Sequence, residues 1–273
     1  MTTTHLARGI RLDGPVGDLL DTLRCIALAL PPHCVFVGRT AALVQCLWVP
    51  PGPHRIEIAH TARGRGRAMS RTTRTDFAGS RRELTAGDVI EFDGVRVTSP
   101  ARTWRDLATR LRPVELVALG DSVLRSGTSE GELIDVVART RGQRGVVAAR
   151  AALPLLDPRS RSRPESHMRF ELLVPGWPRF VPNTVIRDAH GGWLAEPDLH
   201  NERYRIALEY QGSHHTVLDR MRRDLTRSTD VTGQRWQIHG FGPAEVFTHP
   251  DRLRLAVRTM LVLGGWRAGA GGW

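Results

Sequence analysis

PDLHNERYRIALEYQGSHH, residues 197–215, is the stretch that decides the fold of the second half of the chain. Within it, the run from Tyr204 to Tyr210 is apolar or β-prone at most positions, which predicts a buried strand. Because side chains alternate along a strand, Glu209 and Gln211 are expected on the same face. The stretch therefore places a carboxylate and an amide together on one face of a sheet.

A second carboxylate is expected beside Glu209. Residues 193–200 fit the preceding strand of a hairpin, and that pairing brings Asp198 next to Glu209. Two carboxylates that converge from adjacent strands make a hard-oxygen site of the kind that Mg²⁺ prefers. Such a site activates water for phosphodiester cleavage. Mg²⁺ or Mn²⁺ is therefore the expected cofactor.

These residues resemble the PD-(D/E)xK nuclease superfamily and, more narrowly, the small domains related to very-short-patch-repair (Vsr) endonucleases. The resemblance covers roughly residues 160–263. It is carried in order by Pro197-Asp198, Glu209-x-Gln211, Gly212-x-x-His215, an Arg-rich helix with Arg223-Asp224 and Arg227, and the strand 234–238. It implies an α/β restriction-endonuclease-like domain, with a central mixed sheet flanked by helices, that cleaves DNA.

The resemblance also implies a third carboxylate. Vsr-like domains have a glutamate on the first helix, and it would correspond to Glu165, assisting Asp198 and Glu209 at the metal. Ser162-x-x-Glu165 is at the same time a capping box, in which the glutamate closes back on the first turn of the helix. Both roles are compatible, because a helix start can aim a carboxylate at a metal.

The third member of the motif is usually lysine, and here it is Gln211. All 39 basic residues of the chain are arginine, so no lysine from elsewhere can substitute. Glutamine can orient a water molecule but cannot act as a base at neutral pH. The resemblance places proton transfer on His215, with His214 as the less favoured choice, and the ordinary pKa of histidine suits this task.

The helix expected after this motif is rich in arginine. Arg220, Arg223 and Arg227 share one of its faces. One interpretation is contact with DNA phosphates. The alternative is a solvated face with i,i+4 ion pairs such as Arg220–Asp224.

Composition indicates an anionic partner. The chain has 273 residues and a formal net charge of +11. Arginine suits phosphate groups and base edges, so DNA is the expected partner. A gene rich in G and C explains arginine in place of lysine, but not the excess over acidic residues. Through residue 157 there are 22 arginines against 16 acidic residues, and beyond it 17 against 12, so charge alone does not say which half contacts DNA.

The cysteines and the N-terminus suggest a compartment. Cys25, Cys34 and Cys46 are odd in number and widely spaced, which fits neither a disulfide framework nor a zinc site. We expect reduced, mostly buried thiols. Residues 1–14 lack the apolar core of a signal peptide, and the apolar run Leu23–Leu30 is too short to span a bilayer. A soluble cytoplasmic protein without membrane association is expected.

The first half of the chain predicts an α+β domain that becomes helical after residue 99. The polar, arginine-rich tract 61–82 is expected to form a loop or an exposed hairpin. Asp93-Gly94 between two β-rich arms predicts a hairpin, and Ser99-Pro100 predicts a capped helix start. The expected elements are helices at 15–30, 38–47, 113–125, 129–140 and 145–153, and strands at 33–37 and 54–60.

This half resembles the AbiEi-like antitoxin proteins of type IV toxin–antitoxin systems. The resemblance is carried by GRTAALVQCLWVP at 38–50, HRIEIAH at 54–60, the arginine-rich connection and FDGVRVTSPARTWRDLA at 92–108. Beside a nuclease domain, this N-terminal domain would provide substrate contacts or dock a protein partner. The Arg- and Ser-rich run LLDPRSRSRP, 155–164, predicts the boundary. We therefore expect domains at 1–157 and 158–263, followed by a flexible tail at 264–273.

Two functions follow from these patterns. The first is a metal-dependent DNA endonuclease, acting in repair, defence or a toxin–antitoxin-related system. The alternative is a non-catalytic DNA-binding regulator or antitoxin-like protein with a degenerate nuclease domain. A scaffold for a partner protein is a third interpretation, and it predicts no affinity for DNA.

Overall fold

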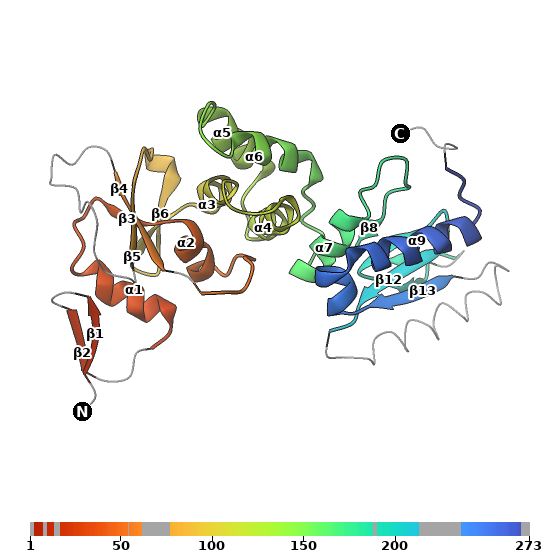
Figure 1. Ribbon diagram of the computed structural model, residues 1–273, viewed down its shortest axis with the longest axis horizontal. Helices are drawn as coiled ribbons and strands as arrows, with labels where there is room; N and C mark the ends of the chain where they lie inside the picture. Colours follow the sequence, from red (N-terminus) through yellow and green to blue (C-terminus); the bar gives the residue numbers. More distant parts are fainter. Residues whose placement is uncertain are drawn as a thin grey trace. The chain divides into compact units, whose positions relative to one another are not determined.

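The computed structural model describes residues 3–7, 10–13, 17–53, 55–61, 77–187, 190–212 and 236–268 (Figure 1). The chain forms two compact units. The first unit comprises Met1–Arg112 and Ser126–Pro154, and the second comprises Pro113–Arg125 and Leu155–Trp273. The chain therefore enters the second unit, returns to the first and enters the second again.

The first unit is built on a mixed five-stranded sheet with strand order β5-β4-β3-β7-β6. Its strands are β3 (Cys34–Phe36), β4 (Ile56–Thr61), β5 (Phe77–Arg82), β6 (Val89–Phe92) and β7 (Val95–Thr98). A separate antiparallel pair consists of β1 (Thr3–Ala7) and β2 (Ile10–Asp13). The end of the tract 61–82 is the parallel partner of β4, so the expectation of a loop or exposed hairpin is wrong for Phe77–Arg82.

Helices α1 (Leu19–Ala27) and α2 (Gly38–Val44) pack on one face of this sheet. The core between them contains Leu23 and Ile26 from α1 and Phe36 from β3. The remaining helices of this unit are α3 (Pro100–Leu107), α5 (Glu130–Arg139) and α6 (Val146–Ala152), with the short 3₁₀ turns η1 (Ala86–Asp88) and η2 (Leu153–Leu155). The predicted helices and strands of this half are all present, with ends shifted by a few residues.

Local sequence rules explain two of these elements. The β6–β7 hairpin turns at Asp93 and Gly94, which both have positive φ, as the turn chemistry predicts. Helix α3 begins after Ser99, whose hydroxyl accepts a hydrogen bond from the Arg102 amide at 3.4 Å. Both sequence predictions are confirmed.

The cysteines are all free, as expected. Their burial differs from the expectation, because only Cys34 is buried. Cys25 is half-buried and Cys46 is exposed.

The second unit has a four-stranded sheet with order β13-β12-β11-β8. Its strands are β8 (Val181–Pro182), β11 (Leu199–Asn201), β12 (Ile206–Tyr210) and β13 (Gln237–Phe241), and a separate pair consists of β9 (Ile186–Arg187) and β10 (Trp193–Ala195). Strand β12 pairs antiparallel with β11 and parallel with β13. The predicted strand 193–200 is thus divided, and its second part makes the expected hairpin.

Helices α7 (Arg163–Glu171) and α9 (Pro250–Leu263) cover one face of this sheet (Figure 1). Ile206 and Leu208 of β12 point into that apolar core, together with residues of both helices and of the π-helical turn η3 (Ala244–Thr248). Ala207 packs in a second cluster with Trp236 on the opposite face. Side-chain alternation places Glu209 on the Ala207 face. The mixed sheet flanked by helices agrees with the fold class expected for this half, although the nuclease-like character is not shown by it.

Helix α4 (Pro113–Arg125) packs with the second unit, although the sequence boundary at residue 157 assigned it to the first. Its buried carboxylates explain the difference. Asp121 is fully buried and accepts hydrogen bonds from Ser166 at 2.6 Å and Arg169 at 2.7 Å, both on α7. Glu115 bonds to Arg163 at 2.8 Å and to His167 at 3.2 Å. These contacts hold α4 against α7.

In the part of the chain that the structure describes, every helix is too short or too polar to cross a bilayer.

Candidate functional site

Asp198 and Glu209 meet at the end of the β11–β12 hairpin. The backbone amide of Asp198 donates to Glu209 Oε1 at 3.2 Å, and the amide of Tyr210 donates to Asp198 Oδ2 at 2.7 Å. These reciprocal bonds fix both carboxylates on the backbone of the partner strand. Glu209 is only 7% exposed. The juxtaposition of these two residues follows the hairpin that the sequence predicts.

Both carboxylates hold protons more tightly than usual. Burial is the largest cause for each, because a charge is costly away from water. Burial and the charge of Glu165 raise the pKa of Asp198 to about 6, against the lowering effect of the Tyr210 amide. Burial and the charge of Asp198 raise the pKa of Glu209 to about 8. The pair therefore shares protons at neutral pH, and a bound cation would relieve its repulsion.

Glu165 lies close enough to raise the pKa of both Asp198 and Glu209. Its own carboxylate, however, does not make the capping-box bond expected from the sequence. Its Oε2 accepts from the Arg161 amide at 2.7 Å and from Asn183 Nδ2 at 2.5 Å. The Glu165 amide donates to Ser162 Oγ at 3.4 Å. Only one bond of the predicted capping box is formed, the one from the Glu165 amide to Ser162 Oγ. The Glu165 carboxylate accepts instead from the Arg161 amide and from Asn183, which follows β8.

The donor set fits a hard divalent cation through two carboxylates. Among the described residues, three potential ligand atoms lie within 4.8 Å of one another only at His33, Cys34 and His60. Glu165 therefore stands back from the Asp198–Glu209 pair. Mg²⁺ commonly keeps several waters and binds one or two carboxylates. If an ion binds here, Asp198 and Glu209 are the two residues that would hold it.

The other predicted site residues are placed only in part. Gln211 is half-buried just beyond β12, and its backbone N–H donates to the Phe241 carbonyl at 2.7 Å. This bond continues the parallel pairing with β13 and keeps Gln211 near Glu209. His215, Arg220, Arg223 and Arg227 lie outside the described residues, so their roles stay predictions.

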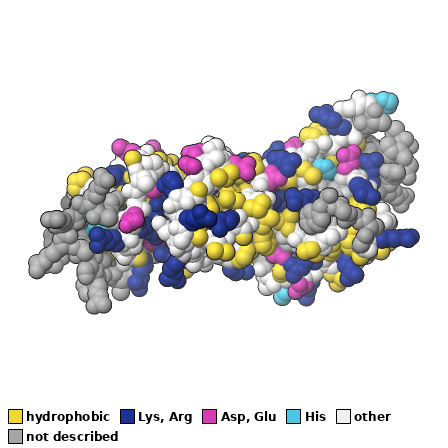
Figure 2. Space-filling model, turned by 90° about the horizontal axis from the view of Figure 1, so that it is seen from above, with side chains coloured by type: hydrophobic (Ala, Val, Ile, Leu, Met, Phe, Trp, Pro, Cys, Tyr) yellow, Lys and Arg dark blue, Asp and Glu magenta, His cyan; other side chains and the backbone are white. Residues whose placement is uncertain are grey.

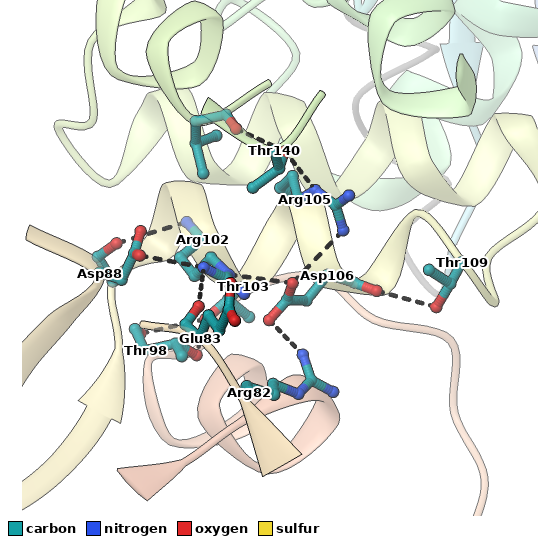
Figure 3. Close-up of polar contacts among 12 residues, drawn as sticks. Arg82, Glu83, Asp88, Thr98, Arg102, Thr103, Arg105, Asp106, Thr109 and Thr140 are labelled. Carbon is teal, nitrogen blue, oxygen red and sulfur yellow. Dashed lines mark hydrogen bonds and ion pairs between the residues drawn. The ribbon is translucent and has the colours of Figure 1, made fainter. Parts of the chain in front are cut away.

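The first unit contains a buried network of arginines and aspartates that sequence analysis did not single out (Figure 3). Arg102 lies between Asp88 and Asp106, at 3.0 Å from each. Arg82 also pairs with Asp106, and Arg105 Nε donates to Thr140 Oγ1 at 2.7 Å. The i,i+4 spacing of Arg102 and Asp106 on α3 was the available signal. The network ties α3 to the sheet and to α5.

A cavity of about 980 Å³ adjoins this network. Asp88, Arg102 and Thr140 contribute to its wall, together with Arg96 and Arg139. Two carboxylate–guanidinium contacts, Arg102–Asp88 and Arg139–Asp88, line it at 3.0 and 3.1 Å. The wall also includes apolar side chains, and its paired charges at Asp88, Arg102 and Arg139 belong to the network that holds α3 and α5.

Figure 2 shows how the basic residues are distributed on one face. Arginines are spread over both units and interleaved with acidic side chains, rather than gathered in a single patch. Charge on this face therefore does not mark one footprint for nucleic acid.

Comparison with known proteins supports the interpretation of the first half. Residues 35–156 match the family described as the AbiEi antitoxin C-terminal domain. Two uncharacterized proteins of Mycobacterium tuberculosis, from two strains, are 34% identical over 162 residues. The match covers 59% of this chain and 59% of each relative, so the chain spans less than two thirds of their length. No solved structure matches the chain. The region 35–156 is thus similar to the antitoxin family, which agrees with the resemblance of residues 38–108.

Proposed function

We propose that the protein is an antitoxin-like regulator that binds DNA or a protein partner. The observation that carries the proposal is the match of residues 35–156 to the AbiEi antitoxin C-terminal domain. The net charge of +11 supports DNA as one partner. In this proposal the first unit, in which Arg102 pairs with both Asp88 and Asp106, is the part that contacts the partner.

Duplex DNA binding tests this regulatory function. We expect affinity for an unrelated duplex to fall at least tenfold between roughly 50 and 200 mM salt, because binding releases counterions. Fluorescence anisotropy with a labelled duplex measures it, and incubation with Mg²⁺ or Mn²⁺ should leave the duplex intact. Absence of binding at the lowest salt would leave a protein partner as the only target.

A second candidate is a metal-dependent DNA endonuclease, and the coupled Asp198–Glu209 pair favours it. A bound Mg²⁺ would supply the Lewis acidity for attack on a phosphodiester. Of the chain's own groups, Asp198 and Glu209 would hold the ion, Glu165 would bind its water shell, and Gln211 would orient the attacking water. His215 would move the proton.

Cleavage of supercoiled plasmid separates the two candidates. If the protein is an endonuclease, Asp198→Asn is expected to reduce cleavage by at least about 100-fold, because it removes one ligand charge. Asp251→Asn is the matched control, since the Asp251 side chain is 90% exposed on α9. Equal cleavage by wild type and Asp198→Asn would reject the site, and no cleavage by any of the three favours the regulator.

A further inference from the structure

His33, Cys34 and His60 converge at one edge of the first-unit sheet. Cys34 opens β3 and lies directly across from His60 of β4 in the antiparallel register. Cys34 Sγ is 3.4 Å from His60 Nδ1, and the rings of His33 and His60 have centroids 5.7 Å apart. One ligand atom from each of the three residues lies within 4.8 Å of the others.

The separation of Cys34 and His60 matches that of two ligands around one metal. In a tetrahedral zinc site, Zn–S and Zn–N bond lengths place a thiolate and an imidazole nitrogen about 3.6 Å apart. The observed Sγ–Nδ1 separation of 3.4 Å is close to this value. A plain hydrogen bond between Cys34 and His60 explains that contact alone, but it does not explain why His33 brings a second imidazole to the same point.

We propose that His33, Cys34 and His60 bind one zinc ion, with a fourth position open to water or another ligand. Thiolate and imidazole are the donors that zinc selects over Mg²⁺. Cys34 is 6% exposed, while His33 and His60 are half-buried, so the ion has a protected side and an accessible side.

The local charges are compatible with metal binding. Burial raises the pKa of the Cys34 thiol above its ordinary value, and the Arg96 guanidinium offsets this effect only in part, so the thiol is protonated before a metal binds. Burial, and next His33, lower the pKa of His60, which keeps its ring neutral and able to ligate. A metal displaces the thiol proton on binding. The ion would fasten the start of β3 to the end of β4, immediately before the arginine-rich segment 62–76 of the sequence.

Cobalt titration of the full-length, metal-stripped protein tests the site. We expect one equivalent of Co²⁺ to produce thiolate-to-cobalt absorption in the near ultraviolet, and Zn²⁺ but not Mg²⁺ to abolish it. Cys34→Ser is expected to remove this absorption, and His33→Gln and His60→Gln to weaken Co²⁺ binding by at least about tenfold each. Cys46→Ser is the matched control, because Cys46 is a free, exposed cysteine.

Each outcome of the cobalt titration either supports or overturns the proposed zinc site. If the wild type shows no thiolate-to-cobalt absorption, the proposal is overturned. It is also overturned if Cys46→Ser loses this absorption while Cys34→Ser keeps it. His33→Gln keeps the test decisive if Cys34→Ser fails to fold. His33 is half-buried and precedes β3, so its replacement is expected to leave the β3–β4 pairing intact. If His33→Gln binds Co²⁺ as tightly as wild type, the three-residue site is rejected. Glu209→Gln should leave the signal unchanged, which separates this site from the carboxylate pair.

Discussion

Replacing Glu209 with glutamine is expected to stabilise the second unit at about pH 8 by on the order of 4 kcal/mol in the absence of divalent metal. The reason is the raised pKa of this carboxyl, about 8 instead of the ordinary 4.5. Below its unfolded-state pKa the native Glu209 is protonated and its stabilising contribution is complete. That contribution is lost as the pH rises through the folded-state pKa. Glutamine keeps an acceptor for the Asp198 amide and never acquires the charge.

Hydrogen exchange of β12 measures this effect within the second unit. Opening free energies in EDTA should be similar for wild type and Glu209→Gln near pH 4, and should diverge up to about pH 8. Asp251→Asn serves as the control, because its exposed side chain should change stability by less than about 0.5 kcal/mol. A Glu209→Gln variant that is less stable than wild type at the higher pH would contradict the carboxylate repulsion.

Metal should offset most of this difference. At a concentration about 100 times its Kd, a cation bound only to the native state stabilises by about 2.7 kcal/mol. Mn²⁺ is therefore expected to slow exchange of β12 in the wild type near pH 8, and to leave Glu209→Gln unchanged. Equal stabilisation of both proteins would place the ion elsewhere.

Replacing Asp121 with alanine is expected to destabilise the second unit by about 3–5 kcal/mol, because it leaves the buried Arg169 without its carboxylate. Asp121 also accepts from the Asp157 amide at 2.7 Å, so three donors lose their acceptor. Burial raises the pKa of Asp121 despite the opposing charge of Arg169, which shows how costly its ionised form is without that partner.

A double-mutant cycle identifies the cause. Arg169→Met removes the other charge and fills similar space, so the double variant should be at least about 1 kcal/mol more stable than the sum of the single changes predicts. Hydrogen exchange in α4 and α7 is the measurement. Strict additivity would mean that the two side chains do not act as a pair.

Much of the carboxylate site was predictable because its determinants are local. Alternation along 204–210 and a hairpin to residue 198 were enough to bring Asp198 and Glu209 together. The Asp93-Gly94 turn and the Ser99 cap were predictable for the same reason. Each depends on conformational preferences within a few residues.

The rest depends on pairings between distant segments. The register that sets Cys34 against His60 joins strands across 26 positions, and nothing in the spacing of the cysteines indicates it. The side chain of Glu165 accepts a hydrogen bond from Asn183, 18 positions away and just after β8. It does not complete the capping box at the start of its own helix. The expected boundary after residue 157 assigned the helix 113–125 to the first domain, whereas the contacts of Glu115 and Asp121 with α7 place α4 in the second unit.

The placement of α4 has a consequence for synthesis. Residues 113–125 leave the ribosome well before α7. Asp121 and Glu115 therefore stay exposed to water until their partners Arg169 and Arg163 have been synthesised. The first unit also remains incomplete during that interval, because it needs α5 and α6, which follow α4. Neither unit can finish folding while the nascent chain ends before residue 126, and no single cut in the gene separates the two units without dividing one of them.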